Sequence, residues 1–261
     1  MPRLAANLTY LFTELDFLDR FAAAADAGFR GVEYQLPYDH DKQAIAEQLG
    51  EHGLHMVLMN LPSGDMQAGD AGIACDPNRT REFRDGVEEG IDYARALACP
   101  QLNCLAGIAP QGVDPGRLFD TFVENLRFAS ERFASAGLRL LIEPINTRDR
   151  PGFYLSRSTQ AMEVIDAVGA DNLFLQFDVY HTQIMQGDIV KNFEAHQERI
   201  CHIQIADNPG RHEPGTGEIN FSFVLAAIDA MGYEGWVSCE YAPSTNTLES
   251  LGWARGYLAQ S

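Results

Sequence analysis

Four polar side chains in the second half of the chain follow short apolar runs, and each carries an oxygen that can bind a cation. Glu143 follows the run LLI, Asp178 follows FLQF, and Glu240 follows VSC. Gln204 follows HI in a fourth run. Short apolar runs are typical of buried strands, and ligands of α/β proteins bind beyond the carboxyl ends of strands. These four strand-end residues are therefore candidates for one functional site.

Three carboxylates at one point repel one another, and their burial adds a desolvation cost. A bound divalent cation offsets both. Carboxylate and amide oxygens are the ligands that Mg²⁺ and Mn²⁺ prefer, whereas zinc usually recruits His or Cys. We therefore expect a Mg²⁺ or Mn²⁺ site with positions left open for water or substrate oxygens. The predicted metal ligands are Glu143, Asp178, Gln204 and Glu240. Taken singly, each carboxylate also fits a plain ion pair with a neighbouring arginine.

Three further side chains are candidates for contact with a substrate. His181 lies three residues after Asp178, and Arg211 and His212 lie in the loop that follows Gln204. The planar guanidinium of arginine binds carboxylates through two parallel hydrogen bonds, and a histidine ring can donate a hydrogen bond to a substrate oxygen. We expect His181, Arg211 and His212 to bind substrate, although a histidine after a strand is often only structural.

Short β-branched or aliphatic runs alternate with longer amphipathic stretches along the chain, as in repeated βα units around a parallel sheet. The predicted strands are Leu4–Asn7, Gly31–Gln35, His55–Asn60, Gln101–Leu105, Arg139–Glu143, Leu173–Asp178, Cys201–Ile205 and Val237–Glu240. Between them, apolar positions recur three and four apart, which predicts helices. Examples are Leu15–Ala27, Lys42–His52, Arg81–Leu97, Leu118–Ala134 and Ser158–Val168.

Eight strands in strict alternation with helices favour closure into a barrel. The chain has 261 residues, close to the roughly 250 residues typical of a (β/α)₈ barrel. An open doubly wound sheet is the alternative, but it would normally carry a Gly-rich phosphate-binding turn, and neither GxGxxG nor GxxxxGK[ST] occurs. No linker or shift in composition indicates a second domain. We therefore predict the α/β class, with a single (β/α)₈ TIM barrel over residues 1–261.

The longest irregular stretch, LPSGDMQAGDAGIACDPN at residues 61–78, follows the third predicted strand. Structureless loops of this length in a compact domain are usually functional. We expect this loop to cover the site, and the alternative is a surface excursion without a role.

The formal net charge is −18, because 37 Asp and Glu residues outnumber 19 Lys and Arg residues. Nucleic-acid binding draws its affinity from Lys and Arg, so this charge argues against a nucleic-acid partner. No run approaches the ~18 apolar residues of a membrane span, and MPRLAANLTY lacks the pattern of a signal peptide. We expect no membrane partner and a cytoplasmic location. The five cysteines are odd in number and form no CxxC pairs, which predicts free thiols.

Several segments resemble the hydroxypyruvate isomerase family, within the xylose-isomerase-like TIM barrel superfamily. They are NLPSGD (60–65), GIAC (72–75), REFRDGV (81–87), LNCLAG (102–107), IEPIN (142–146), HIQIADNPGRHEPGTGEIN (202–220) and CEY (239–241). The resemblance runs from about Ala5 to Trp253. The segment 202–220 is specific to this branch, whereas a single acid at a strand end is common to the superfamily.

The resemblance implies a barrel that holds a divalent metal at the four strand-end residues and moves a proton with Glu143 and Glu240 as catalytic residues. The implied reaction interconverts hydroxypyruvate and tartronate semialdehyde, through an enediolate that forms when a glutamate removes a carbon-bound proton. The implied substrate is a small hydroxy-oxo acid, and the implied role is in glyoxylate metabolism. The chain does not depart from the family pattern at the four strand-end positions.

Related activities stay open at this stage. A 2-oxo-tetronate isomerase or a ketose 3-epimerase would use the same barrel and the same metal constellation. A non-catalytic barrel that binds sugar acids would be expected to have lost a ligand or a base, and none is lost. An endonuclease-like barrel would need several histidine ligands and a basic surface. The sequence is compatible with a homo-oligomer, and it does not indicate which glutamate acts on which carbon.

Overall fold

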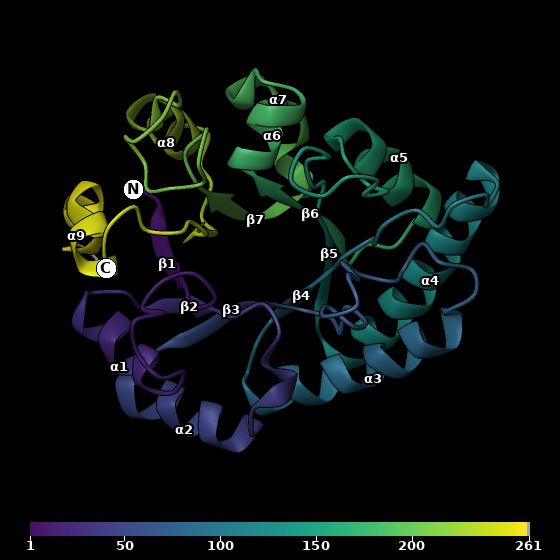
Figure 1. The fold of residues 1–261 in the computed structure, drawn as a ribbon, viewed down its shortest axis with the longest axis horizontal. Helices are drawn as coiled ribbons and strands as arrows, with labels where there is room; N and C mark the ends of the chain where they lie inside the picture. Colours follow the sequence, from purple (N-terminus) through teal and green to yellow (C-terminus); the bar gives the residue numbers. More distant parts are fainter. Residues whose placement is uncertain (260–261) are drawn as a thin grey trace.

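The fold is a closed barrel of eight parallel strands, surrounded by helices (Figure 1). It is taken from a computed structural model that describes residues 1–259. Strands pair in chain order from β1 to β8, and β1 also pairs with β8, which closes the ring. The strands are β1 Arg3–Asn7, β2 Gly31–Glu33, β3 His55–Asn60, β4 Gln101–Cys104, β5 Arg139–Ile142, β6 Leu173–Asp178, β7 Ile200–Ile205 and β8 Trp236–Cys239. The predicted (β/α)₈ architecture is confirmed, and residues 260 and 261 of the predicted domain lie outside the described residues.

Helices connect successive strands and cover the outside of the barrel (Figure 1). They are α1 Asp19–Asp26, α2 Lys42–His52, α3 Thr80–Ala96, α4 Pro115–Ala136, α5 Ser158–Val168, α6 Val179–Met185, α7 Ile189–His196, α8 Phe221–Ala230, α9 Thr247–Ser250 and α10 Arg255–Leu258. Short 3₁₀ turns occupy Pro37–Asp39, Gln197–Arg199 and Leu251–Ala254.

Two helices begin three or four residues away from their predicted starts, for local reasons. Helix α4 starts at Pro115 because Asp114 accepts a hydrogen bond from the N–H of Arg117 at 3.1 Å, and proline is favoured in the first turn. Helix α1 starts at Asp19, later than predicted. The preceding Phe12 has a φ of 59° and donates its N–H to Thr247 Oγ1 at 2.7 Å, so this stretch packs as a loop against α9.

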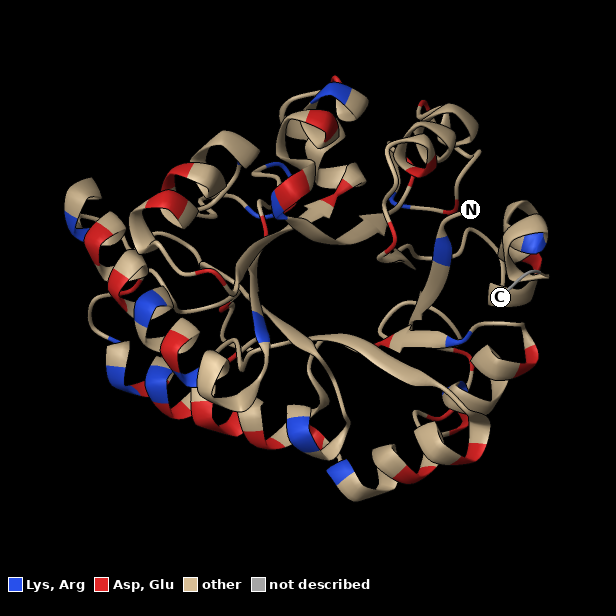
Figure 2. Ribbon diagram, turned by 180° about the vertical axis from the view of Figure 1, so that it is seen from behind, with Lys and Arg blue, Asp and Glu red and all other residues tan. Residues whose placement is uncertain are grey.

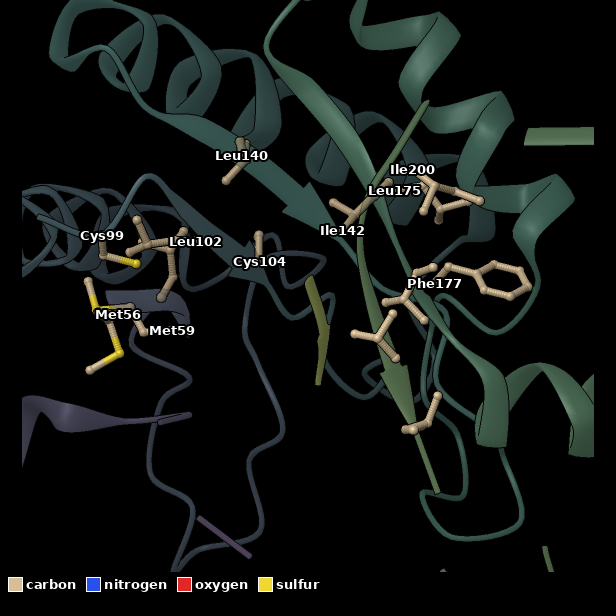
Figure 3. Packing of buried hydrophobic residues seen from close by; sticks show 14 of the residues in the cluster. Met56, Met59, Cys99, Leu102, Cys104, Leu140, Ile142, Leu175, Phe177 and Ile200 are labelled. Carbon is tan, nitrogen blue, oxygen red and sulfur yellow. The ribbon is translucent and has the colours of Figure 1, made fainter. Parts of the chain in front are cut away.

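Apolar side chains form the layer between the barrel and the helices. Leu140 and Ile142 of β5 and Leu175 and Phe177 of β6 belong to this core (Figure 3). Successive side chains of a strand point to opposite faces, so the alternate residues point into the barrel. One of them, Leu141, packs in a separate, smaller apolar cluster.

Toward the carboxyl ends of the strands, the interior of the barrel becomes polar. The buried polar residues on or next to the strands include Asn7, Glu33, Gln101, Asn103, Glu143, Gln176, Asp178, His202, Gln204, Ser238 and Glu240. Buried polar groups are usually hydrogen-bonded. In this layer a network of side-chain hydrogen bonds joins Asn7, Glu33, Gln176, His202, Gln204 and Glu240. It sets the positions of the site residues.

Charged residues lie mostly on the outer helices, with both signs mixed along α3 and α4 (Figure 2). None of the helices within residues 1–259 is long and apolar enough to cross a membrane. The five cysteines are free thiols, as predicted. Four of them are buried and Cys201 is half-buried.

Candidate active site and metal centre

The four strand-end residues lie where the prediction placed them, at the carboxyl ends of four consecutive strands. Glu143 directly follows β5, Asp178 ends β6, Gln204 is the last but one residue of β7, and Glu240 directly follows β8. Asp178 and Gln204 are paired neighbours in the β6–β7 register. All four are at most 4% exposed.

Glu143, Asp178 and His181 each offer a ligand atom, and these atoms lie within 4.8 Å of one another. Asp178 caps the amino end of α6 and accepts the N–H of His181 at 3.0 Å, which holds the imidazole beside the two carboxylates. His181 Nε2 lies 3.9 Å from Glu143 Oε1 and 3.7 Å from Asp178 Oδ2. Carboxylate oxygens and an imidazole nitrogen are both ligands of divalent cations, so this group could hold one.

The imidazole of His181 is neutral and presents a donor to the carboxylates. Burial lowers the pKa of His181 to about 4. The side-chain amide of Asn146 lies 2.7 Å from Nδ1 and donates to it, which assigns the ring proton to Nε2. His181 Nε2–H can therefore donate to an oxygen that enters the site, and its role in substrate binding stays a prediction.

Burial and mutual repulsion raise the pKa values of both predicted catalytic residues. The pKa of Glu143 lies well above its ordinary value because of burial and the charges of Glu240 and Asp178. Burial raises the pKa of Glu240 to about 8, although Arg211 opposes the shift. Arg211 offsets only part of the repulsion among these buried carboxylates, so the donor set fits a divalent metal.

Gln204 reaches the site, but its amide nitrogen faces the carboxylates. Nε2 donates to Glu33 Oε1 at 2.8 Å and to Glu240 Oε1 at 3.2 Å, while Oε1 accepts from Gln176 at 2.6 Å. Binding a metal through the carbonyl oxygen would require this amide to turn. In this structure Gln204 thus donates a hydrogen bond to each of two carboxylates.

Arg211 lies beside Glu240 with one donor unused. Its Nη2 forms an ion pair with Glu240 Oε2. The guanidinium packs between the rings of Tyr10 and Tyr180, with its central carbon 5.0 and 5.3 Å from the ring centroids. Among the described residues, its buried Nε has no hydrogen-bond partner. A buried, unpaired donor is costly, and a ligand carboxylate would satisfy it.

The loop after β7 holds Arg211 in this position. Asp207 accepts backbone N–H groups from four residues of the loop, including Gly215 and Gly217 at 2.9 Å each. Arg211 has a φ of 56°, and its carbonyl accepts the N–H of Ala242 at 2.9 Å. The loop is therefore tied to the chain that follows β8.

His212 is placed apart from the other predicted site residues. Its Nδ1 lies 2.7 Å from the carbonyl oxygen of Ala242. The ring is not among the residues that line the cavity described next. In this structure His212 links two loops.

A cavity of about 80 Å³ opens at the centre of these residues. Glu143, His181, Arg211 and Glu240 line it, whereas Asp178 and Gln204 are not among its lining residues. The long loop at 61–78 contributes Met66 and Ala71 to the wall, in agreement with its expected place over the site.

Sequence reasoning missed several residues of this wall. Tyr10 and Gln35 line the cavity, and Gln35 Nε2 donates to Glu240 Oε1 at 2.5 Å. Arg150 also lines it, and within residues 1–259 its side chain makes no hydrogen bond or ion pair. No local pattern marks these residues, which come from separate loops.

Comparisons with known proteins place the chain among isomerase-like barrels. The family model described as xylose isomerase-like TIM barrel matches residues 21–257. The chain is 48% identical over 257 residues to hydroxypyruvate isomerase of Escherichia coli K12, covering 98% of this chain and all of that one. It is 43% identical over 260 residues to 2-oxo-tetronate isomerase of Cupriavidus necator, covering all of both chains.

Solved structures agree with the fold. A Brucella melitensis protein described as an AP endonuclease, family 2, superimposes with a TM-score of 0.96 at 43% identity, covering 98% of this chain and 99% of that one. An L-ribulose 3-epimerase superimposes with a TM-score of 0.82 at 21% identity, covering all of this chain and 94% of that one. At that identity the likeness extends to the fold alone.

Proposed function

Because the chain belongs to the xylose isomerase-like TIM barrel family, we propose that it is an isomerase that interconverts hydroxypyruvate and tartronate semialdehyde. One observation carries the proposal: two buried glutamates, Glu143 and Glu240, reach one small cavity from β5 and β8, beside an arginine with an unused donor. The relatives named as isomerases of small hydroxy-oxo acids support it.

The cavity volume favours a small substrate. A water molecule needs about 10–15 Å³ measured in this way. The cavity of about 80 Å³ therefore has room for roughly five to eight atoms of that size. A three-carbon hydroxy-oxo acid fills such a space, whereas a free hexose exceeds it.

Glu143, Asp178, Gln204 and Glu240 are the residues that we propose as metal ligands, for Mg²⁺ or Mn²⁺. When bound, such a cation supplies positive charge that stabilises the oxygens of an enediolate. Gln204 would take part only after its amide has turned. His181 Nε2 is a further group at this centre and can donate to a substrate oxygen.

Other side chains at the site bind the substrate and transfer its protons. Arg211 binds the substrate carboxylate through its free Nε and thereby orients the two carbons that exchange carbonyl and hydroxyl. One of the two glutamates removes the proton from the hydroxyl-bearing carbon, and a carboxylic acid at the site returns a proton to the neighbouring carbon. The hydroxyl proton passes to the former carbonyl oxygen, so that carbonyl and hydroxyl exchange places. The apolar and aromatic wall limits access of water to the enediolate.

A 2-oxo-tetronate isomerase is the second candidate, because a larger cavity adjoins the small one, as described below. A nuclease is disfavoured by the net charge of −18, which would repel a phosphate backbone. A non-catalytic sugar-acid receptor is disfavoured because both glutamates are present and line the cavity. As part of the same proposal, the enzyme acts in the cytoplasm, in glyoxylate metabolism.

The test is turnover of hydroxypyruvate by metal-stripped protein before and after addition of Mg²⁺ or Mn²⁺, with 2-oxo-tetronate and free ketoses in parallel. We expect metal-dependent activity with preference for hydroxypyruvate. In Glu143→Gln and Glu240→Gln, kcat should fall by roughly 10²–10⁴-fold with the fold intact, as for loss of a general acid or base. Full activity in both variants would exclude the two-carboxylate mechanism.

A further inference from the structure

Two cavities adjoin at the mouth of the barrel, and two side chains separate them. The reaction cavity measures about 80 Å³, and a second cavity of about 530 Å³ lies between the loops that follow β2 and β3. Gln35 and Met66 line both cavities. These two residues therefore form the partition between them.

Gln35 is the fixed half of the partition. Its side-chain amide donates to Glu240 Oε1 at 2.5 Å, and its backbone N–H donates to Thr9 Oγ1 at 3.0 Å. Its carbonyl accepts the N–H of Asn60 at 2.9 Å. Because Gln35 contacts a catalytic glutamate and two neighbouring segments, it cannot withdraw without disturbing the site.

Met66 is the movable half of the partition. Its side chain is unbranched, and the residue is 40% exposed. The turn beneath it is held by Asp65, whose carboxylate accepts the N–H groups of Gln67 and Ala68 at 2.9 and 3.0 Å. The backbone of Met66 is thus fixed while its thioether side chain is free to change rotamer, as methionine does readily.

The second cavity is chemically suited to the hydroxylated end of a longer acid. Its lining includes the exposed carboxylates of Asp39 and Asp65 and the ring of Tyr34. Carboxylates accept hydrogen bonds from sugar hydroxyls, and aromatic faces pack against their C–H groups. The negative charge would reject a second substrate carboxylate, so the acid group has to stay on the side of Arg211.

We propose that Met66 determines the length of substrate that the enzyme accepts, by separating a reaction cavity for three-carbon hydroxy-oxo acids from a second cavity that takes the tail of four-carbon and longer ones. This inference rests on the proposed function and adds its substrate range. With the methionine side chain across the opening, the three-carbon acid is favoured. When the side chain is displaced or shortened, the two spaces join.

The experiment compares kcat/KM for hydroxypyruvate, 2-oxo-tetronate and a free pentulose in the metal-loaded wild-type enzyme and in Met66→Ala and Met66→Trp. A change of one methylene in a pocket alters discrimination by roughly 10–200-fold. We therefore expect Met66→Ala to shift the ratio of the four-carbon to the three-carbon substrate upward by about tenfold or more. Met66→Trp should shift this ratio downward.

Ala68→Ser is the matched control, since Ala68 lies on the same exposed turn and lines neither cavity. Glycerate and erythronate lack the carbonyl group, so their inhibition constants report binding without chemistry. Relative to glycerate, erythronate should bind more tightly in Met66→Ala and more weakly in Met66→Trp than in the wild type. If the substrate ratio and both inhibition constants in the two Met66 variants match those of Ala68→Ser, the partition has no role and the isomerase proposal stands. If the wild-type enzyme turns over neither hydroxy-oxo acid, the proposed function fails and this inference fails with it.

Discussion

Two side-chain amides join Glu33 to Glu240. Asn7 Nδ2 lies 2.7 Å from Glu33 Oε1 and 3.3 Å from Glu240 Oε1. Gln204 Nε2 bridges the same two oxygens at 2.8 and 3.2 Å. Glu33 Oε2 in turn accepts from His202 Nε2 at 2.7 Å. A buried carboxylate outside the predicted site thus orients a proposed catalytic residue.

Glu33→Ala should lower kcat by roughly 10–100-fold, the usual cost of losing a partner that orients a functional group. The reason is that Asn7 and Gln204 lose the acceptor that aligns them toward Glu240. Glu33→Gln should retain more of the activity than Glu33→Ala, because its amide oxygen can still accept hydrogen bonds from Asn7 and Gln204. Steady-state kinetics measure kcat in both variants, and circular dichroism checks that they are folded. A kcat in Glu33→Ala equal to that of the wild type would contradict this role of Glu33.

Asp178→Asn should raise the thermal stability of the metal-free protein, because it removes one of three buried, mutually repelling carboxylates. A gain of about 1 kcal/mol corresponds to roughly 2–4 °C in a chain of this size. Mn²⁺ should raise the Tm of the wild type, since a ligand that binds the folded state stabilises it, and should no longer do so in the variant. Differential scanning calorimetry with and without EDTA measures both effects. The exposed Asp171→Asn serves as control, and a variant that Mn²⁺ still stabilises fully would count against a site at Asp178.

Arg211→Lys should raise KM for hydroxypyruvate by about tenfold or more while kcat changes less. Lysine keeps a positive charge near Glu240 but lacks the planar fork that pairs with a carboxylate, and it packs less well between Tyr10 and Tyr180. The assay is initial rate against substrate concentration. Arg157→Gln, which removes an exposed cation at the start of α5, should leave KM unchanged. A KM in Arg211→Lys equal to the wild-type value would remove this residue from substrate binding.

Glu14→Gln should lower the Tm at neutral pH and have no effect at low pH. Glu14 accepts the N–H and the hydroxyl of Thr247 at 2.6 and 3.0 Å, and although burial opposes it, these bonds hold its pKa below the ordinary value. A carboxylate with a lowered folded-state pKa contributes stability above its unfolded-state pKa and loses it as pH falls through the folded-state value. Melting curves of both proteins between about pH 7 and pH 2 should therefore converge in acid. A constant difference across this range would show that the charge of Glu14 is irrelevant.

The positions of the four strand-end residues followed from the sequence because each is set by one local event, the end of a buried strand. Glu33 carried the same signal and was overlooked. The predicted strand continued to Gln35, which placed Glu33 in its middle, whereas β2 ends at Glu33 after a register shift between Val32 and Glu33. A strand that ends at Glu33 would have made this residue a fifth strand-end candidate for the site.

Residues that reach the cavity from loops were not predictable in this way. The path of the loop that carries Tyr10 depends on Phe12 and Glu14 meeting Thr247, more than two hundred residues later. Neighbouring residues in the sequence can also point to different places. The chain turns at Arg211, whose side chain lines the cavity, whereas the ring of His212 contacts the carbonyl oxygen of Ala242. Their roles in binding stay predictions.

The pairing of β1 with β8 has a consequence for the order of events during synthesis. Ala5 pairs with Ser238, and Asn7 meets Glu240 across the seam of the ring. A nascent chain still attached to the ribosome with its last strand inside the exit tunnel has neither the seam nor the second glutamate. Contacts between residues so distant in sequence form late in folding. Acquisition of the metal would thus be a property of the finished chain, and an arrested nascent chain that stops before residue 236 should bind Mn²⁺ only weakly.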